Sequence, residues 1–344
     1  MNRQTILYFD PMTEDMKELL RSQLPSGYDL YFWDEQNDVS KPKVLAQAKY
    51  LMATVFPITG EMIRAAGQTR HIQKCGVGLD NIDMNTASGH GISVSNIPGC
   101  NAVCVAELTV MFILSLYRKL PYANNRTKQG EWLTWALRPD SFEMRGKTHG
   151  LVGMGHVGWE TALRSKAMGT SIVYYDKNRL PLEKEVELNA EFLGLEQLLQ
   201  KSDIISVHVP LLPATKGLIN SASFKLMKPN AVLINVARGG VVDEAALYEA
   251  LVNGEIKGAA VDVWEQEPVN PAHPLLTLEQ VIATPHIGGG TRDTLIHVYH
   301  EAFNNIQRVE HGLEPLYAGN MELLRSYAAV AATKQTLKQV EVSF

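Results

Sequence analysis

The run Leu151-Val-Gly-Met-Gly-His-Val-Gly158 limits the possible folds of this chain more than any other segment. It matches the pattern G-x-G-x-x-G at Gly153, Gly155 and Gly158. The apolar residues before the glycines predict a short buried strand, and the residues after them predict a helix. A second strand, rich in β-branched and aromatic residues, is predicted at 171–176. This order of strand, loop, helix and strand predicts a βαβ unit that binds a dinucleotide.

Each glycine of the motif has a distinct physical role in such a unit. Gly153 permits the tight turn, Gly155 lets the backbone approach a pyrophosphate, and Gly158 lets the helix pack closely on the strand. The start of the helix offers unpaired N–H groups and the positive end of its dipole to the phosphates. Asp176, at the end of the second strand, is expected to accept hydrogen bonds from the adenosine ribose. Its charge would repel a 2′-phosphate, so the motif predicts NAD rather than NADP, a preference that the nearby Arg179 weakens slightly.

The composition excludes several classes of function. With 344 residues, of which 45% are hydrophobic and 20% charged, the chain is typical of a globular protein of about two domains. A net charge of −5 gives no support for a nucleic-acid partner. No apolar run is long enough to cross a bilayer, and the first residues lack the pattern of a signal peptide. The three cysteines, Cys75, Cys100 and Cys104, have no zinc-site spacing, so we expect no metal and a reducing, cytoplasmic location.

Alternation of strands and helices along the chain predicts the α/β class. In the first part, strands are predicted at 5–10, 28–33, 50–55, 72–77 and 92–96. In the second part, they are predicted at 149–152, 171–176, 204–209, 231–236, 258–263 and 281–284. The two sets predict two doubly wound parallel sheets. The expected domains are residues 1–100 together with about 300–344, and residues 101–299, which bind NAD; a helix at 293–310 would carry the chain back to the first domain.

Three polar residues follow strands of the second part and predict a catalytic group. Arg238 comes after an apolar strand and before two glycines, where its guanidinium could hold a carboxylate and a carbonyl oxygen. Glu267 precedes a proline, and His286 leaves its strand through Pro285. A histidine beside a carboxylate forms a general acid–base pair. Each residue alone also has an ordinary interpretation, such as a strand-end arginine paired with an acid or a polar loop residue.

Several motifs in order make the chain similar to one family. They begin at Cys75-Gly-Val-Gly-Leu-Asp-Asn-Ile-Asp83 and Asn96-Ile-Pro-Gly-Cys-Asn-Ala-Val-Cys-Val-Ala-Glu107, and continue through the glycine-rich loop. They end with Asn235-Val-Ala-Arg-Gly-Gly240, Asp262-Val-Trp-Glu-Gln-Glu-Pro268 and Thr284-Pro-His-Ile-Gly-Gly289. With these motifs the chain resembles the D-isomer-specific 2-hydroxyacid dehydrogenases over almost its whole length.

The resemblance implies an architecture and a role for each motif. It implies two Rossmann-like domains, the first of them flavodoxin-like and substrate-binding, with the active site in the cleft between them. It assigns Arg238 to the substrate carboxylate and carbonyl, His286 to proton transfer, and Glu267 to support of the histidine. It also implies a homodimer, with 101–117 and 122–135 near the contact.

The resemblance also assigns binding residues. The substrate would be held by Val77, Gly78, Arg238 and His286. The cofactor would be held by Gly153, Gly155, His156, Val157, Gly158, Asp176, His208, Val209, Pro210, Ala237 and Asp262. His156 and Val157 would lie beside the pyrophosphate, His208 to Pro210 beside the adenine, and Asp262 near the nicotinamide amide.

Departures from the family pattern bear on the substrate. Phosphoglycerate dehydrogenases carry an arginine in the loop after the third strand, whereas residues 52–58 here contain no basic residue. Glu267 stands where formate dehydrogenases have glutamine, and Cys104 replaces a usual serine. The sequence therefore predicts an NAD-dependent 2-ketoacid reductase for a small, unphosphorylated substrate. Alternatives are a glyoxylate or hydroxypyruvate reductase, a phosphoglycerate dehydrogenase, and an NAD(H)-responsive, corepressor-like binding protein that uses no substrate.

Overall fold

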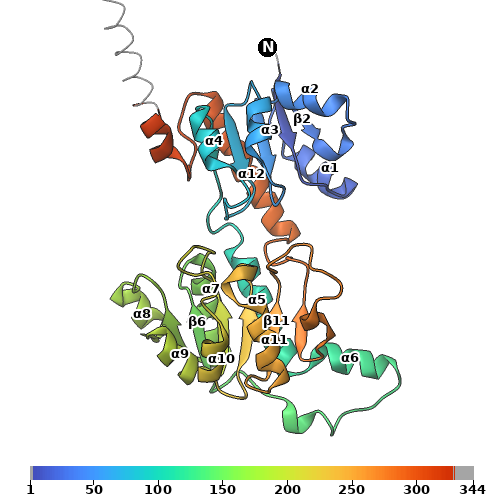
Figure 1. Cartoon of the computed structure of the whole chain (residues 1–344), viewed down its shortest axis with the longest axis vertical. Coiled ribbons are helices and arrows are strands. Elements are labelled where there is room, and N and C mark those ends of the chain that lie inside the picture. Colours follow the sequence, from blue (N-terminus) through green and yellow to red (C-terminus); the bar gives the residue numbers. More distant parts are fainter. Residues whose placement is uncertain (1–2, 328, 330–344) are drawn as a thin grey trace, which may run out of the picture. The chain divides into compact units, whose positions relative to one another are not determined.

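The chain forms two compact units. A computed structural model describes residues 3–327 and 329 (Figure 1). Unit 1 contains the described residues up to Cys100 and those from Arg292 onward, and unit 2 is Asn101–Thr291. Residues 328 and 330–344, which the sequence analysis assigned to the first domain, lie outside the described residues. The predicted α/β class with two parallel sheets is confirmed.

Unit 1 is a five-stranded parallel sheet in the order β2-β1-β3-β4-β5. Its strands are β1 (Gln4–Tyr8), β2 (Tyr28–Phe32), β3 (Tyr50–Ala53), β4 (His71–Lys74) and β5 (Ser93–Ser95). Its α-helices are α1 (Glu14–Ser22), α2 (Ser40–Gln47), α3 (Gly60–Ala65), α4 (Met84–Gly89) and α12 (Arg292–Glu310). Because alternate strand residues face opposite sides, Ile6 and Tyr8 pack with residues of α1 and α12, whereas Leu7 packs with residues of α2, α3 and α4. The strand order reverses between β1 and β3.

Unit 2 is a seven-stranded parallel sheet in the order β12-β11-β10-β9-β6-β7-β8. Its strands are β6 (Thr148–Val152), β7 (Ser171–Tyr175), β8 (Ala190–Phe192), β9 (Ile204–Val207), β10 (Val232–Asn235), β11 (Gly258–Val261) and β12 (Val281–Ala283). Its α-helices are α5 (Ala102–Tyr117), α6 (Leu120–Lys128), α7 (His156–Ala167), α8 (Leu182–Leu188), α9 (Leu195–Lys201), α10 (Ser221–Leu226) and α11 (Glu244–Val252). The strand order reverses between β9 and β6, which places the glycine-rich loop at the switch point.

Helices cover both faces of the second sheet. On one face, α5 packs on Ile204, Val232 and Ile234 and also lies against α7. On the other face, residues of α9, α10 and α11 pack on Ile205 and Leu233. Both faces are therefore buried, which explains the near-continuous apolar sequence of the central strands. In Figure 1, α6 and the segment after it stand out from the rest of unit 2.

Several boundaries differ from the sequence prediction. The strand predicted at 204–209 ends at Val207, and the helix predicted from Gly158 begins at His156. Strands end earlier because the residues after them leave the ladder to form the loops of the site. The strand β8 and the helix α6 were not predicted. With three residues, β8 is too short to show periodicity. Within the described ranges, no helix combines the length and apolar character needed to cross a membrane.

Candidate active site

The glycine-rich loop connects β6 to α7 and requires glycine at two positions for steric reasons. Gly153 has φ +104°, and a Cβ there would lie 2.8 Å from the carbonyl carbon of His208. A Cβ on Gly158 would lie 2.2 Å from the oxygen of Gly153. By contrast, a Cβ on Gly155, the N-cap residue of α7, would meet nothing within 4 Å. The loop is thus tightly packed at Gly153 and Gly158 and open at Gly155, at the N-terminus of α7. This arrangement fits a dinucleotide pyrophosphate.

Asp176 lies directly after β7 and is tied to the glycine-rich loop. Its Oδ2 accepts a hydrogen bond of 2.7 Å from the N–H of Met154, and its Oδ1 accepts one of 3.0 Å from the N–H of Asn178. Arg179, which the sequence places nearby, donates two hydrogen bonds of 2.8 Å to Glu185. The guanidinium of Arg179 is therefore held by Glu185. The carboxylate of Asp176, at the end of β7, fits a ribose diol.

The remaining predicted cofactor residues of this end of the sheet lie next to the same loop. His156 and Val157 form the first turn of α7. His208, Val209 and Pro210 follow β9, with the backbone of His208 and Val209 against Gly153. The Nε2 of His208 lies 2.8 Å from Ser206 Oγ, while its Nδ1 is buried with no hydrogen-bond partner among the described residues. Burial lowers the pKa of His208 to about 3, so the ring is neutral.

Arg238 follows β10 on a loop that Asn235 holds in place. Asn235 donates through Nδ2 to the oxygen of Arg238 (3.1 Å) and accepts from the N–H of Ala237 (3.2 Å). Arg238 itself donates from Nη1 to the oxygen of Ala237, at 2.7 Å. A Cβ on the next residue, Gly239, would lie 2.0 Å from the carbonyl carbon of Trp264. This close approach brings the loops after β10 and β11 together, with Arg238 near Glu267.

Glu267 and His286, for which the sequence predicts a general acid–base pair, lie within hydrogen-bonding distance of each other. The Oε2 of Glu267 lies 2.8 Å from Nδ1 of His286, and its Oε1 accepts a hydrogen bond from the N–H of Trp264 (3.1 Å). Burial alone would raise the pKa of Glu267, but the hydrogen bonds from His286 and Trp264 and the charges of His286 and Arg238 hold it below its usual value. The carboxylate is therefore ionised at neutral pH. The side chain of His286 is 33% exposed.

Asp262 positions the loop that carries His286. Its carboxylate is buried and accepts hydrogen bonds from the N–H groups of Ile287 (2.9 Å) and Gly288 (2.8 Å) and from the hydroxyl of Thr284 (2.6 Å). Asn235, Trp264 and Thr284, which support these loops, were not predicted as site residues. Each lies within three residues of a predicted one, but only the hydrogen bonds show its role. The predicted contact of Asp262 with the nicotinamide amide stays a prediction.

Val77 and Gly78 belong to unit 1 and follow β4. The oxygen of Val77 accepts a hydrogen bond of 2.5 Å from Nδ2 of Asn96, and the Val77 residue is 40% exposed. The binding of a substrate carboxylate by this backbone stays a prediction.

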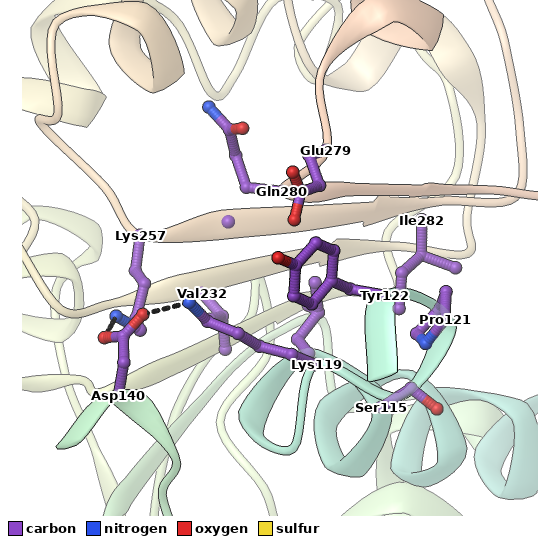
Figure 2. Close-up of a pocket in the computed structure, with 12 residues that line it drawn as sticks. Ser115, Lys119, Pro121, Tyr122, Asp140, Val232, Lys257, Glu279, Gln280 and Ile282 are labelled. Atoms are coloured by element: carbon purple, nitrogen blue, oxygen red, sulfur yellow. Dashed lines mark hydrogen bonds and ion pairs between the residues drawn. The ribbon is translucent and has the colours of Figure 1, made fainter. Parts of the chain in front are cut away.

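A cavity of about 300 Å³ lies elsewhere in unit 2. It is lined by Val232 and Gly258, the first residues of β10 and β11. Arg238 and Glu267 instead follow the opposite ends of these strands. Figure 2 shows Lys119 and Lys257 directed at the shared Asp140, with Tyr122 and Glu279 nearby. Both lysines are ion-paired with Asp140, and the cavity lies at the ends of the strands opposite to the glycine-rich loop, so it has no evident part in the chemistry. Among the described residues, no three histidine, cysteine or acidic side chains are grouped to hold a metal ion.

The loops after β6, β7, β10, β11 and β12 thus define an NAD-dependent oxidoreductase with an arginine and a histidine–carboxylate pair. Residues 110–288 match the family model described as the D-isomer specific 2-hydroxyacid dehydrogenase, NAD binding domain. The chain belongs to the D-isomer specific 2-hydroxyacid dehydrogenase family, whose members oxidise the CH–OH group of 2-hydroxy acids or reduce the corresponding ketones.

Relatives from several organisms share most of the chain. It is 37% identical over 313 residues to a glyoxylate reductase of Aeropyrum pernix, covering 88% of this chain and 92% of the relative. It is 35% identical over 320 residues to a D-3-phosphoglycerate dehydrogenase of Archaeoglobus fulgidus, covering 92% of this chain but only 59% of that relative. Among solved structures, one reported for the pyruvate reductase of Chlamydomonas reinhardtii superposes with a TM-score of 0.81 at 28% identity, covering 91% of this chain and 98% of that one.

Proposed function

We propose that the protein reduces a small 2-keto acid to the D-2-hydroxy acid with NADH. NADH supplies the hydride when bound. Arg238 binds the carboxylate and the ketone oxygen of the substrate with its two-pronged guanidinium, which stabilises negative charge as it develops on that oxygen. The protonated His286 gives its proton to the alkoxide, and Glu267 stabilises the imidazolium and holds the ring through Nδ1. The observation that carries the proposal is this histidine–carboxylate pair beside Arg238, together with the glycine-rich loop of the same unit.

The proposed cofactor site comprises the glycine-rich loop, Asp176, the residues after β9, Ala237 and Asp262. The backbone of Val77 and Gly78 would bind the substrate carboxylate. The substrate is unphosphorylated, because the loop after β3 has no basic side chain in 52–58. Glyoxylate, hydroxypyruvate and pyruvate are the first candidates, since relatives named as reductases of glyoxylate and pyruvate match the chain over most of its length.

Oxidation of NADH by a panel of 2-keto acids tests this function. We expect turnover with at least one of glyoxylate, hydroxypyruvate, pyruvate and branched 2-keto acids, and little with 3-phosphohydroxypyruvate. A preference for the phosphorylated acid would instead support a phosphoglycerate dehydrogenase. Binding of NADH without reduction of any 2-keto acid would support the corepressor-like alternative, in which the cofactor governs assembly. The intact set of Arg238, Glu267 and His286 favours the enzyme.

We also propose that the protein acts as a cytoplasmic homodimer through α5 and the segment that contains α6. A groove of about 1080 Å³ runs along these elements and is lined by Val110, Met111 and Leu114, among others. Trp132 and Trp135, in the segment after α6, are 84% and 75% exposed. Large apolar side chains at such exposure are typical of an interface. Cys75, Cys100 and Cys104 form no disulfide bond among the described residues, which is consistent with the cytoplasm.

Light scattering coupled to size-exclusion chromatography tests the dimer. We expect the mass of two chains for the wild type and a shift toward the monomer for Trp135→Glu. The control is Trp159→Glu, which changes the same residue type in α7, outside α5 and the segment that contains α6. A monomeric wild type would contradict the proposal.

A further inference from the structure

Trp264, in the loop after β11, contacts both members of the histidine–carboxylate pair or the loops that carry them. Its backbone N–H donates a hydrogen bond of 3.1 Å to Oε1 of Glu267. Its indole Nε1 donates one of 3.1 Å to the oxygen of Thr284, which precedes His286 by two residues. The Trp264 residue is only 5% exposed. A displacement of Trp264 would therefore disturb Glu267 and the loop of His286 together.

The peptide unit between Trp264 and Glu265 is held by the segment that leads into α11. A Cβ on Gly239 would lie 2.2 Å from the oxygen of Trp264, so the two loops are packed without space between them. The N–H of Glu265 donates a hydrogen bond of 2.6 Å to Oε1 of Glu244, the first residue of α11. Glu244 is buried. The loop that carries Glu267 thus begins on a carboxylate that has no part in the proposed proton transfer.

His273 forms a second histidine–carboxylate pair with Glu244. Its Nε2 lies 3.0 Å from Oε2 of Glu244, and its Nδ1 accepts a hydrogen bond of 3.3 Å from the N–H of Leu275, in the 3₁₀ helix η4 (Pro274–Thr277). Because a backbone N–H can only donate, Nδ1 is the acceptor, and Nε2 carries the proton that is donated to Glu244. The ring of His273 also meets the indole of Trp264 edge to face, with centroids 5.5 Å apart. The pair therefore restrains both the backbone after Trp264 and its ring.

We propose that Glu244 and His273 are positioning residues for the proposed ketone reduction, and that they act through Trp264 on Glu267. The inference rests on the proposed function and deepens it, because it names the residues that keep Glu267 aligned with His286. Glu267 contacts His286 through one oxygen at 2.8 Å, so a shift of its loop by about 1 Å would lengthen this contact beyond hydrogen-bonding range. Misplacement by this amount in an active site can lower the rate by about 10²-fold.

Two substitutions separate the contact with Glu244 from the capping of η4. His273→Gln places an amide N–H near the position of Nε2, so it keeps the donor to Glu244 and loses the cap. His273→Asn places an oxygen near the position of Nδ1, so it keeps the cap for Leu275 and does not reach Glu244. We expect kcat to fall about tenfold in His273→Asn and by less than about threefold in His273→Gln, with the Kd of NADH nearly unchanged in both. Equal kcat in the two variants, or a greater loss in His273→Gln, would overturn the proposal.

A double-mutant cycle tests whether the pair acts through Glu267. If His273 matters because it keeps Glu267 in place, His273→Asn should cost little further activity once Glu267→Gln has removed the carboxylate. The double variant should then have about the same kcat as Glu267→Gln alone. The control is Glu249→Gln, at an exposed position of α11, which should leave kcat unchanged in both backgrounds. Losses that multiply fully in the double variant would show that His273 does not act through Glu267.

Amide hydrogen exchange separates failure of this inference from failure of the proposed function, because it needs no substrate. In the full chain, the N–H groups of Trp264 and Glu265 should exchange faster in His273→Asn than in the wild type or in His273→Gln. If no 2-keto acid is reduced but this order of exchange rates holds, the proposed reaction is wrong and the pair still holds the loop. If 2-keto acids are reduced but the exchange rates of all three proteins are equal, the reaction stands and the positioning role is wrong.

Discussion

Nδ1 of His286 lies 2.8 Å from Oε2 of Glu267, and this single hydrogen bond relates the two residues on which the proposed proton transfer depends. The two residues come from different loops, after β12 and after β11. The carboxylate contacts Nδ1, so the proposed proton transfer would use Nε2. Its consequences for catalysis and for pH dependence can be measured.

Replacing Glu267 by Gln should move the pH dependence of ketone reduction. Glutamine keeps the shape of the side chain but lacks the charge that stabilises the imidazolium of the proposed mechanism, so kcat/KM should fall. Glu267→Gln also has no carboxylate to protonate, so it should lack the acid-side loss of activity expected for the wild type. In the wild type, the pKa of Glu267 is held below its usual value, so the pair should persist in mildly acidic solution and be lost only as pH falls through that lowered value. Steady-state kinetics from about pH 3 to 9 measure both effects, with the Kd of NADH as control. Superimposable profiles would show that Glu267 does not act on the histidine.

Arg238→Ala should lower turnover by about 10²–10³-fold, by analogy with the loss of one donor to a developing oxyanion. The Kd of NADH should hardly change, because the proposed role concerns the substrate. Arg238→Lys keeps the charge but not the paired geometry and should recover only part of the loss. Near-normal turnover of Arg238→Ala on every accepted substrate would make the arginine structural.

Alanine at two positions of the glycine-rich loop should separate an effect on cofactor binding from an effect on stability. Gly155→Ala adds a Cβ that meets nothing within 4 Å, so Tm should be unchanged while the Kd of NADH rises. Gly158→Ala forces a Cβ to 2.2 Å from the oxygen of Gly153, so it should lower stability by about 1–3 kcal/mol even without cofactor. Thermal unfolding and fluorescence titration on both variants measure this. A lower Tm for Gly155→Ala than for the wild type would contradict the open space around a Cβ at that residue.

Asp176→Ser should narrow the preference for NADH over NADPH. Removing the carboxylate abolishes its repulsion of a 2′-phosphate, but it also removes the hydrogen bond to the N–H of Met154. We therefore expect weaker NADH binding together with stronger NADPH binding. Fluorescence titration with both cofactors gives the ratio. Equal affinity of the wild type for the two cofactors would refute the role of Asp176.

Buried histidines should make the protein less stable in acid. Burial lowers the pKa of His149 to about 3, and the nearby His208 contributes to this. Burial likewise lowers the pKa of His71 to about 4. Because these folded values lie below the unfolded value of about 6.5, their stabilisation is complete above pH 6.5 and is lost as pH falls toward the folded values. Each such histidine should lower the unfolding free energy by up to about 1.4 kcal/mol per pH unit in that range.

Urea unfolding at pH 7 and pH 5 measures this effect. His149→Gln, which keeps a polar side chain between Ser165 and Ser206, should show a smaller loss between the two pH values than the wild type does. The control is His90→Gln, at an exposed histidine in unit 1. An equal loss in the two variants would show that His149 is not a source of the acid sensitivity.

The sequence by itself determined the class of fold and pointed to the residues on which the proposed chemistry depends. Spacing of glycines, an acid after the second strand and apolar runs of strand length are local properties, so the βαβ unit at Gly153–Asp176 could be predicted from them. Arg238, Glu267 and His286 could be selected because each follows a predicted strand, and parallel strands end at one edge of a sheet.

Only the tertiary structure decided which side chains meet. Three sets of hydrogen bonds join residues that are 19 to 46 positions apart. They connect Glu267 with His286, Asp262 with the loop of His286, and Asp10 with the N–H groups of residues 54–56. Such contacts depend on strand order and on the exact point at which each strand ends. Periodicity does not encode those features, because they result from packing between elements that are distant in the chain.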